Sequence, residues 1–148
     1  MGFNNNKTMA SINTYLNFNG NTEEAFNFYK SVFGGEFAVV QRFKDSPGCE
    51  GMAAGDQEKL MHIALPIGGN VLMGTDITDP TPASTFGTGI SISVDAATEE
   101  EAHQLFNGLS AGGTVTMELQ KTFWGALFGM ATDKFGIQWM VNHDYDQK

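Results

Sequence analysis

The sequence is short of positive charge and of long apolar runs. Only 8 of its 148 residues are Lys or Arg, against 17 Asp or Glu, which gives a formal net charge of −9. Nucleic-acid binding depends on clustered cations that neutralise phosphates, so this composition argues against a nucleic-acid partner. No apolar run approaches the ~20 residues that cross a bilayer, and we therefore expect no membrane partner.

Cysteine is nearly absent as well. The single one, Cys49, excludes a disulfide within the chain and any metal site built from thiolates alone.

Residues 1–10 are polar and lack the hydrophobic segment of a secretory signal. We interpret them as a disordered leader and expect a cytoplasmic protein.

What the sequence does contain is a repeat. Residues 15–37 read YLNFNGNTEEAFNFYKSVFGGEF, and residues 92–115 read ISVDAATEEEAHQLFNGLSAGGTV. Each copy has a short strand, a helix-start signal (Asn21 or Thr98), an amphipathic helix and a glycine exit. A repeat of this length predicts two similar modules, and the space between such modules is a natural place for a ligand.

Each copy continues into three further predicted strands, so the βαβββ plan occurs twice. The predicted strands are residues 12–18, 37–43, 60–67 and 71–75, then 90–94, 114–119, 126–132 and 137–142. We therefore predict an α+β fold with a single domain over residues 11–148. Module one covers about 11–77, a linker covers 78–88, and module two covers about 89–143. Each module is expected to hold an antiparallel sheet covered by one helix.

Alternation along the strands separates an apolar face from a polar one. A two-residue turn at Gly68-Gly69 pairs Leu65 with Leu72 and Ala64 with Met73. The polar faces carry no charged side chain in the strands compared, whereas a sheet face in bulk water usually carries several. A solvated face is the alternative, but we favour a ligand-binding cleft. Its predicted lining is Asn13, Tyr15, His62, Met73, Thr75, Ser91, Trp124, Gln138 and Met140.

Two members of this lining have competing interpretations. Trp124 could pack a corner of the core, or it could stack on a planar ligand at the rim of the cleft. His62 is the only histidine on the predicted cleft face. It could be a hydrogen-bonded residue of the sheet, or it could orient a ligand or act as a general base, which makes it the one candidate catalytic residue.

Three motifs carry a family resemblance over about residues 12–143. They are the E-A-x-x-F-Y-x-x-x-F-G helix (24–34), the hairpin MHIALPIGGNVLMGTD (61–76), and WG-x-x-F-G-M-x-T-D-x-F-G-x-x-W (124–139). Together with the paired modules, they resemble the vicinal oxygen chelate superfamily, which includes glyoxalases, extradiol dioxygenases and bleomycin-resistance proteins. The match is closest to its PhnB-like branch. The resemblance implies a cleft between the sheets and a homodimer.

Enzymes of this superfamily resemble one another in a divalent-metal site of His, Glu or Gln ligands. Carried onto this sequence, the ligand positions fall at Asn13, Met73, Gly89 and Met140. Glycine has no donor and thioethers prefer soft ions, so this set does not suit a hard divalent metal. We therefore expect no metal and no cofactor.

These expectations lead to three functional hypotheses. The first is a metal-independent small-molecule binding protein, similar to the bleomycin-resistance members, with a neutral polar-aromatic cleft. The alternative is a metal-dependent glyoxalase-like lyase or isomerase that uses His62 and a non-standard ligand set. In the third, the partner subunit fills the cleft, which is then structural. The sequence leaves open whether the protein is an enzyme.

Overall fold

The structure, a computed structural model, describes residues 10–79 and 81–145. Apart from Ala10, the predicted leader of residues 1–10 lies outside the described residues. The described chain forms two compact units: residues 10–22 and 35–79 make the first, and residues 23–34 and 81–145 make the second. The bounds of the modules predicted from the repeat stay a prediction, and the compact units group one helix, residues 23–34, with the second sheet.

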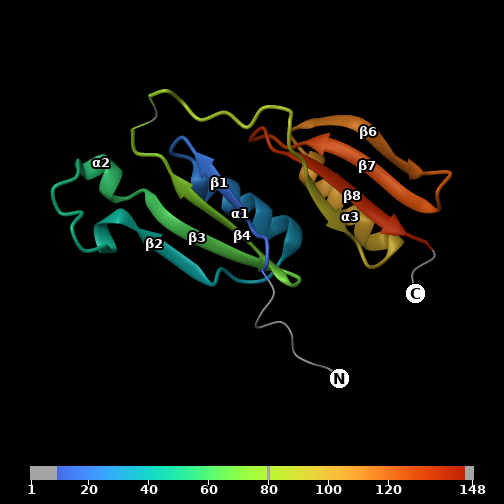
Figure 1. The fold of residues 1–148 in the computed structure, drawn as a ribbon, viewed down its shortest axis with the longest axis horizontal. Helices are drawn as coiled ribbons and strands as arrows, with labels where there is room; N and C mark the ends of the chain where they lie inside the picture. Colours follow the sequence, from blue (N-terminus) through green and yellow to red (C-terminus); the bar gives the residue numbers. More distant parts are fainter. Residues whose placement is uncertain (1–9, 80, 146–148) are drawn as a thin grey trace, which may run out of the picture. The chain divides into compact units, whose positions relative to one another are not determined.

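The first unit contains a four-stranded sheet (Figure 1). Its strands lie in the order β1-β4-β3-β2, so that β1 and β2 form the edges. A 3₁₀ turn η2 and a short helix α2 follow β2. The bounds are β1 (Thr14–Phe18), β2 (Val39–Arg42), η2 (Phe43–Asp45), α2 (Ala54–Gln57), β3 (Leu60–Ile67) and β4 (Asn70–Asp76).

The second unit contains the second four-stranded sheet and the two long helices. Its strands lie in the order β5-β8-β7-β6, with β5 and β6 at the edges (Figure 1). The bounds are α1 (Thr22–Phe33), β5 (Ile92–Asp95), α3 (Glu99–Ser110), β6 (Thr114–Lys121), β7 (Ala126–Thr132) and β8 (Gln138–Asp144). The two sheets thus repeat one strand order, and the α+β class is confirmed.

The prediction that both sheets are antiparallel is wrong. β1 pairs in parallel with β4, and β5 pairs in parallel with β8, while the remaining pairs are antiparallel. The next strand in the chain, β2, runs in the same direction as β1. Two hairpin reversals then bring β4 back to that direction beside β1.

The hairpin between β3 and β4 has the predicted register. Leu65 pairs with Leu72 and Ala64 with Met73. Gly68 in the turn has φ 60°, in the left-handed region that glycine enters without strain. Because this two-residue turn fixes the register, it also fixes which side chains share each face of the first sheet.

Both long helices begin where the sequence predicts. Thr98 caps α3: its hydroxyl accepts from the backbone N–H of Glu101 at 3.0 Å, and the Glu101 carboxylate accepts from Ala97 at 2.7 Å. At the start of α1, the backbone N–H of Thr22 donates to the buried Asp76 carboxylate at 2.9 Å. Asp76 also accepts from the N–H of Leu60 at 2.8 Å, so one carboxylate joins the helix start to β3.

The core of the second unit is built around the carboxylate of Asp133, which is 3% exposed. One of its oxygens accepts from the Tyr29 hydroxyl at 2.6 Å and from the Trp139 indole N–H at 2.8 Å. The other accepts from the backbone N–H groups of Phe135 and Ile137, at 2.8 and 3.1 Å. These four donors offset the cost of burying a charge, and they tie α1, the β7–β8 turn and β8 together.

Both helices pack on the same face of the second sheet. The rings of Tyr29 and Phe33 lie 5.5 and 5.6 Å from that of Trp139. On α3, Phe106 packs so closely on β7 that a Cβ added at Gly129 would lie 2.8 Å from the Phe106 ring.

In the part of the chain that the structure describes, no helix is long and apolar enough to cross a membrane.

The Tyr29–Asp133 bond gives the first prediction. Tyr29→Phe removes one donor to a buried carboxylate and should lower the free energy of unfolding by roughly 1.5–3 kcal/mol. Tyr15→Phe is the matched control, because the Tyr15 side chain is 42% exposed and its loss should change stability by less than about 0.5 kcal/mol. Urea unfolding of both variants measures the difference, and equal effects would contradict the role given to Tyr29.

The same bond predicts a dependence on alkaline pH. Burial, and then the Asp133 carboxylate beside it, raise the pKa of Tyr29 well above its usual 10.0. Above pH 10 the unfolded chain ionises this tyrosine while the folded protein keeps it protonated, so stability falls as pH rises. Between about pH 10 and 11 the wild type should lose about 1 kcal/mol more than Tyr29→Phe, measured by urea midpoints. A parallel decline of both proteins would contradict this.

Candidate functional site

The polar face of the first sheet centres on a tyrosine–histidine pair, and we call it the tyrosine face (Tyr15, His62, Met73 and Thr75). Tyr15 pairs with Met73 across β1 and β4, and Met73 pairs with Ala64 on β3. The Tyr15 hydroxyl lies 3.0 Å from Nδ1 of His62, and the two rings stack 5.7 Å apart with an angle of 27°. When Tyr15 donates this bond, the ring proton of His62 sits on Nε2.

Thr75 and Asn13 already use part of their hydrogen-bonding capacity within the sheet. The Thr75 hydroxyl donates to the backbone carbonyl of Met61 at 2.7 Å, which leaves its oxygen able to accept. The side-chain carbonyl of Asn13 accepts from the backbone N–H of Val71 at 2.8 Å. The tyrosine face thus combines hydroxyl and imidazole groups with a thioether, and none of its four residues is an Asp, Glu, Lys or Arg.

The other predicted lining residues lie in the second unit. The side-chain amide of Gln138 donates to the carbonyl of Ile90 at 2.8 Å and to the Ser91 hydroxyl at 3.3 Å. The side chains of Gln138 and Ser91 are therefore hydrogen-bonded to each other. Met140 pairs with Ser93 on β5. Trp124 lies in the β6–β7 turn and is 58% exposed, so the alternative of a buried core corner does not apply to it.

A row of methionines on the second sheet was missed by the sequence analysis. Met140 pairs with Met130, and Met130 pairs with Met117. These three side chains lie on one face of adjacent strands, which we call the methionine face. Two register shifts in β6 hide this alignment from a simple alternation pattern, because they move Met117 relative to its neighbours along the strand.

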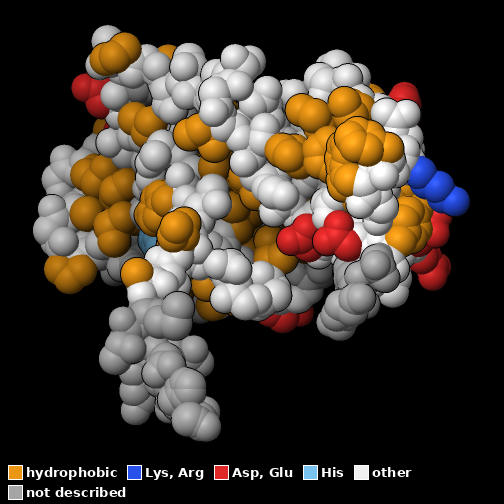
Figure 2. All heavy atoms as spheres, turned by 45° about the vertical axis from the view of Figure 1, so that its right-hand side comes forward, with side chains coloured by type: hydrophobic (Ala, Val, Ile, Leu, Met, Phe, Trp, Pro, Cys, Tyr) orange, Lys and Arg blue, Asp and Glu red, His pale blue; other side chains and the backbone are white. Residues whose placement is uncertain are grey.

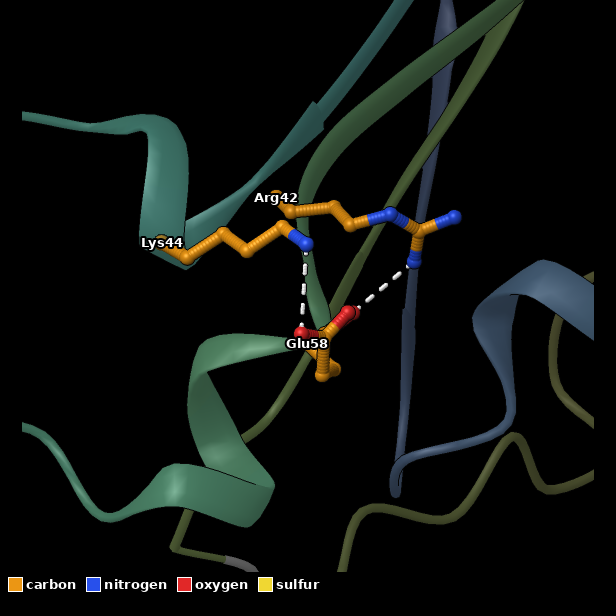
Figure 3. Close-up of polar contacts among 3 residues, drawn as sticks. All are labelled: Arg42, Lys44 and Glu58. Carbon is orange, nitrogen blue, oxygen red and sulfur yellow. Dashed lines mark hydrogen bonds and ion pairs between the residues drawn. The ribbon is translucent and has the colours of Figure 1, made fainter.

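Described cations of the first unit lie beside acidic residues, and Figure 3 shows Arg42 and Lys44 with Glu58. Lys44 forms an ion pair with Glu58 at 3.2 Å, and Lys59 pairs with Asp56 at 3.0 Å. Arg42 donates to the backbone carbonyl of Glu58 at 2.8 Å. Exposed pairs of this kind contribute little to stability, but each acid offsets the positive charge beside it.

The residues at the superfamily's metal-ligand positions do not fit a hard divalent cation. Met73 and Met140 offer thioethers, Gly89 offers no side chain, and the carbonyl of Asn13 is bound to Val71. In the described residues, no group of three or more His, Cys, Asp and Glu side chains is arranged to hold a metal ion. We therefore derive no chemical step through a metal.

Comparison with known proteins agrees with this fold. The chain is 42% identical to protein PA1353 from Pseudomonas aeruginosa, whose crystal structure superposes with a TM-score of 0.78 over 93% of this chain and 100% of that one. It is 28% identical, with a TM-score of 0.73, to the Bacillus cereus PhnB protein described as a putative 3-demethylubiquinone-9 3-methyltransferase, over 90% and 99% of the two chains. Protein YjdN of Escherichia coli is 32% identical over 88% of this chain and 93% of its own length.

The family match covers nearly the whole described sequence. The profile that matches residues 11–141 is that of the Glyoxalase/Bleomycin resistance protein/Dioxygenase superfamily. The repeated strand order β1-β4-β3-β2 and β5-β8-β7-β6 agrees with the paired modules that the sequence predicted. This chain belongs to the Glyoxalase/Bleomycin resistance protein/Dioxygenase superfamily.

Proposed function

We propose that the protein binds a small uncharged molecule without the help of a metal. The observation that carries this proposal is the Tyr15–His62 pair, a 3.0 Å hydrogen bond that joins a side chain of the edge strand β1 to one of β3 across the polar face of the sheet. A solvated sheet face has little need of such a pair, whereas a binding site uses a few oriented donors and acceptors for specificity.

The tyrosine face suits a ligand that both accepts and donates hydrogen bonds. When Tyr15 donates to Nδ1, the Nε2–H of His62 is a donor, and the oxygens of Tyr15 and Thr75 are acceptors. The thioether of Met73 adds a soft apolar contact between them. A strongly anionic ligand is disfavoured, because the described cations nearest this sheet are accompanied by acids.

The remaining predicted contacts, Ser91, Trp124, Gln138 and Met140, extend the proposal to the second unit. A cleft between the modules, a homodimer and a cytoplasmic location stay predictions. The alternative enzyme, a glyoxalase-like lyase or isomerase, requires His62 to bind a metal. The bond to Tyr15 engages only Nδ1 of His62, and Nε2 is the nitrogen that a metal would use. A measurement of bound metal therefore decides between the two functions.

Metal analysis separates the two functions. The untagged protein should purify with less than about one tenth of an equivalent of Zn, Ni, Mn or Fe, because its donor set suits none of them. Its melting temperature should not rise when these metals are added. Stoichiometric metal that is lost in His62→Ala would overturn the proposal in favour of the lyase or isomerase.

Ligand binding at the tyrosine face has its own readout. Nicotinamide, an uncharged planar amide with donors and acceptors, should shift the NMR signals of the Tyr15 and His62 rings and of the Thr75 methyl group. Tyr15→Phe should weaken its binding about fivefold to tenfold, because one bond to the imidazole and one acceptor are lost. Tyr145→Phe, a matched change at an exposed tyrosine of the second unit, should leave it unchanged. Shifts that cluster away from the tyrosine face would count against the proposal.

A further inference from the structure

The methionine face is organised as a ladder across four strands. Ser93 on β5 pairs with Met140 on β8, Met140 pairs with Met130 on β7, and Met130 pairs with Met117 on β6. Paired residues on neighbouring strands point to the same side of the sheet, so the three thioethers form one row. Met117 is 39% exposed, and Met130 and Met140 are half-buried.

Aromatic rings continue this row along the strands. Phe128 lies two residues from Met130 on β7 and therefore on the same face. The ring of Trp124 meets that of Phe128 edge-on at 6.2 Å, and Phe123 beside it is 96% exposed. Figure 2 shows hydrophobic side chains gathered at the surface of the unit that holds β6, β7 and β8.

Polar side chains limit the apolar area on its other sides. Ser93 on β5 ends the row on one side. At one end of the strands, the next cross-strand pair beyond Met130 and Met140 is Thr132 with Gln138. At the other end Asn142 bonds to the carboxylates of Asp95 and Asp144, each at 3.2 Å. A negatively charged ligand would therefore meet acids next to the apolar area.

The size of this area favours a small ligand over a second copy of the chain. Three strands span about 10 Å, and two residues along a strand span about 7 Å. An area of these dimensions matches one or two fused rings, whereas a stable protein interface needs about 800 Å² from each partner. Methionine sulfur makes favourable contacts with aromatic rings, and its flexible side chain adapts to their shape.

We propose that the methionine face, Met117, Met130 and Met140 with Phe128 and Trp124, binds the flat apolar part of an uncharged aromatic ligand. This inference rests on the proposed ligand-binding function and gives the ligand a chemical class. The thioethers contact the ring faces, Trp124 and Phe128 contact their edges, and Gln138 and Ser93 border the polar substituents.

The test uses N-phenyl-1-naphthylamine, an uncharged two-ring aromatic probe that fluoresces in apolar surroundings. It should bind the full chain with one-to-one stoichiometry, and Met130→Lys should weaken binding at least about tenfold because a cation then occupies the centre of the row. Met130→Leu keeps the apolar surface and should change the affinity less than about threefold. Val40→Lys, a matched change at an exposed apolar residue of the edge strand β2, should have no effect.

Several results would overturn this inference. They are no binding of the probe to the wild type, unchanged binding by Met130→Lys, or an equal loss in Val40→Lys. A tenfold loss in Met130→Leu would also overturn it, because leucine keeps the apolar surface that the inference makes responsible for binding. If sedimentation shows a wild-type dimer that Met130→Lys or Met117→Lys makes monomeric, the face belongs to a second copy and the inference is wrong.

Two features keep the test decisive. Should Met130→Lys fail to fold, Met117→Lys replaces it, because Met117 lies on an exposed edge strand where lysine is well tolerated. Nicotinamide shifts at Tyr15 and His62 are measured on the same proteins. Shifts that persist while the probe does not bind would leave the proposed function intact and remove only this inference.

Discussion

The buried carboxylate of Asp133 is the constraint on which the second unit depends. It lies in the turn between β7 and β8, yet it accepts a hydrogen bond from the hydroxyl of Tyr29, which lies on α1 and precedes it by 104 residues. It also fixes Trp139, on whose ring Tyr29 and Phe33 pack. An unpaired carboxylate at this depth would be costly, so the helix, the turn and β8 hold one another in a single arrangement. The sheet face opposite Trp139, which bears the methionines, is thereby held in register as well.

Local signals in the sequence predicted much of this structure. Gly68-Gly69 determined the β3–β4 register, and the Thr98–Glu101 capping box determined the start of α3. The role of Asp133 could not be predicted, because no periodicity links an Asp-x-x-Gly turn to Tyr29. The parallel pairing of β1 with β4 was missed for a related reason: it depends on the path of the chain around the whole sheet.

Alternation predicted which side chains share the polar face of the first sheet, whereas the binding role of that face stays a prediction. Alternation assigned Tyr15, His62 and Met73 to one face, and the hydrogen bond between the first two agrees with that assignment. It did not reveal Met117, because β6 has two register shifts. Equivalent backbone positions now hold different groups: Tyr15 beside Met73 in one sheet, and Ser93 beside Met140 in the other. The two sheets therefore share one strand order but carry different side chains on these faces.

The irregular edge strand β6 has a further consequence for the protein at high concentration. Its stretch TVTMEL is rich in residues that favour extended structure, and nearly all of it is exposed at the edge of a sheet. Such an edge can recruit strands from other molecules and start aggregation. The two register shifts break the regular row of backbone donors and acceptors, and the charges of Glu118 and Lys121 discourage stacking. The irregularity that conceals the methionine row thus helps to keep the sheet from growing at that side.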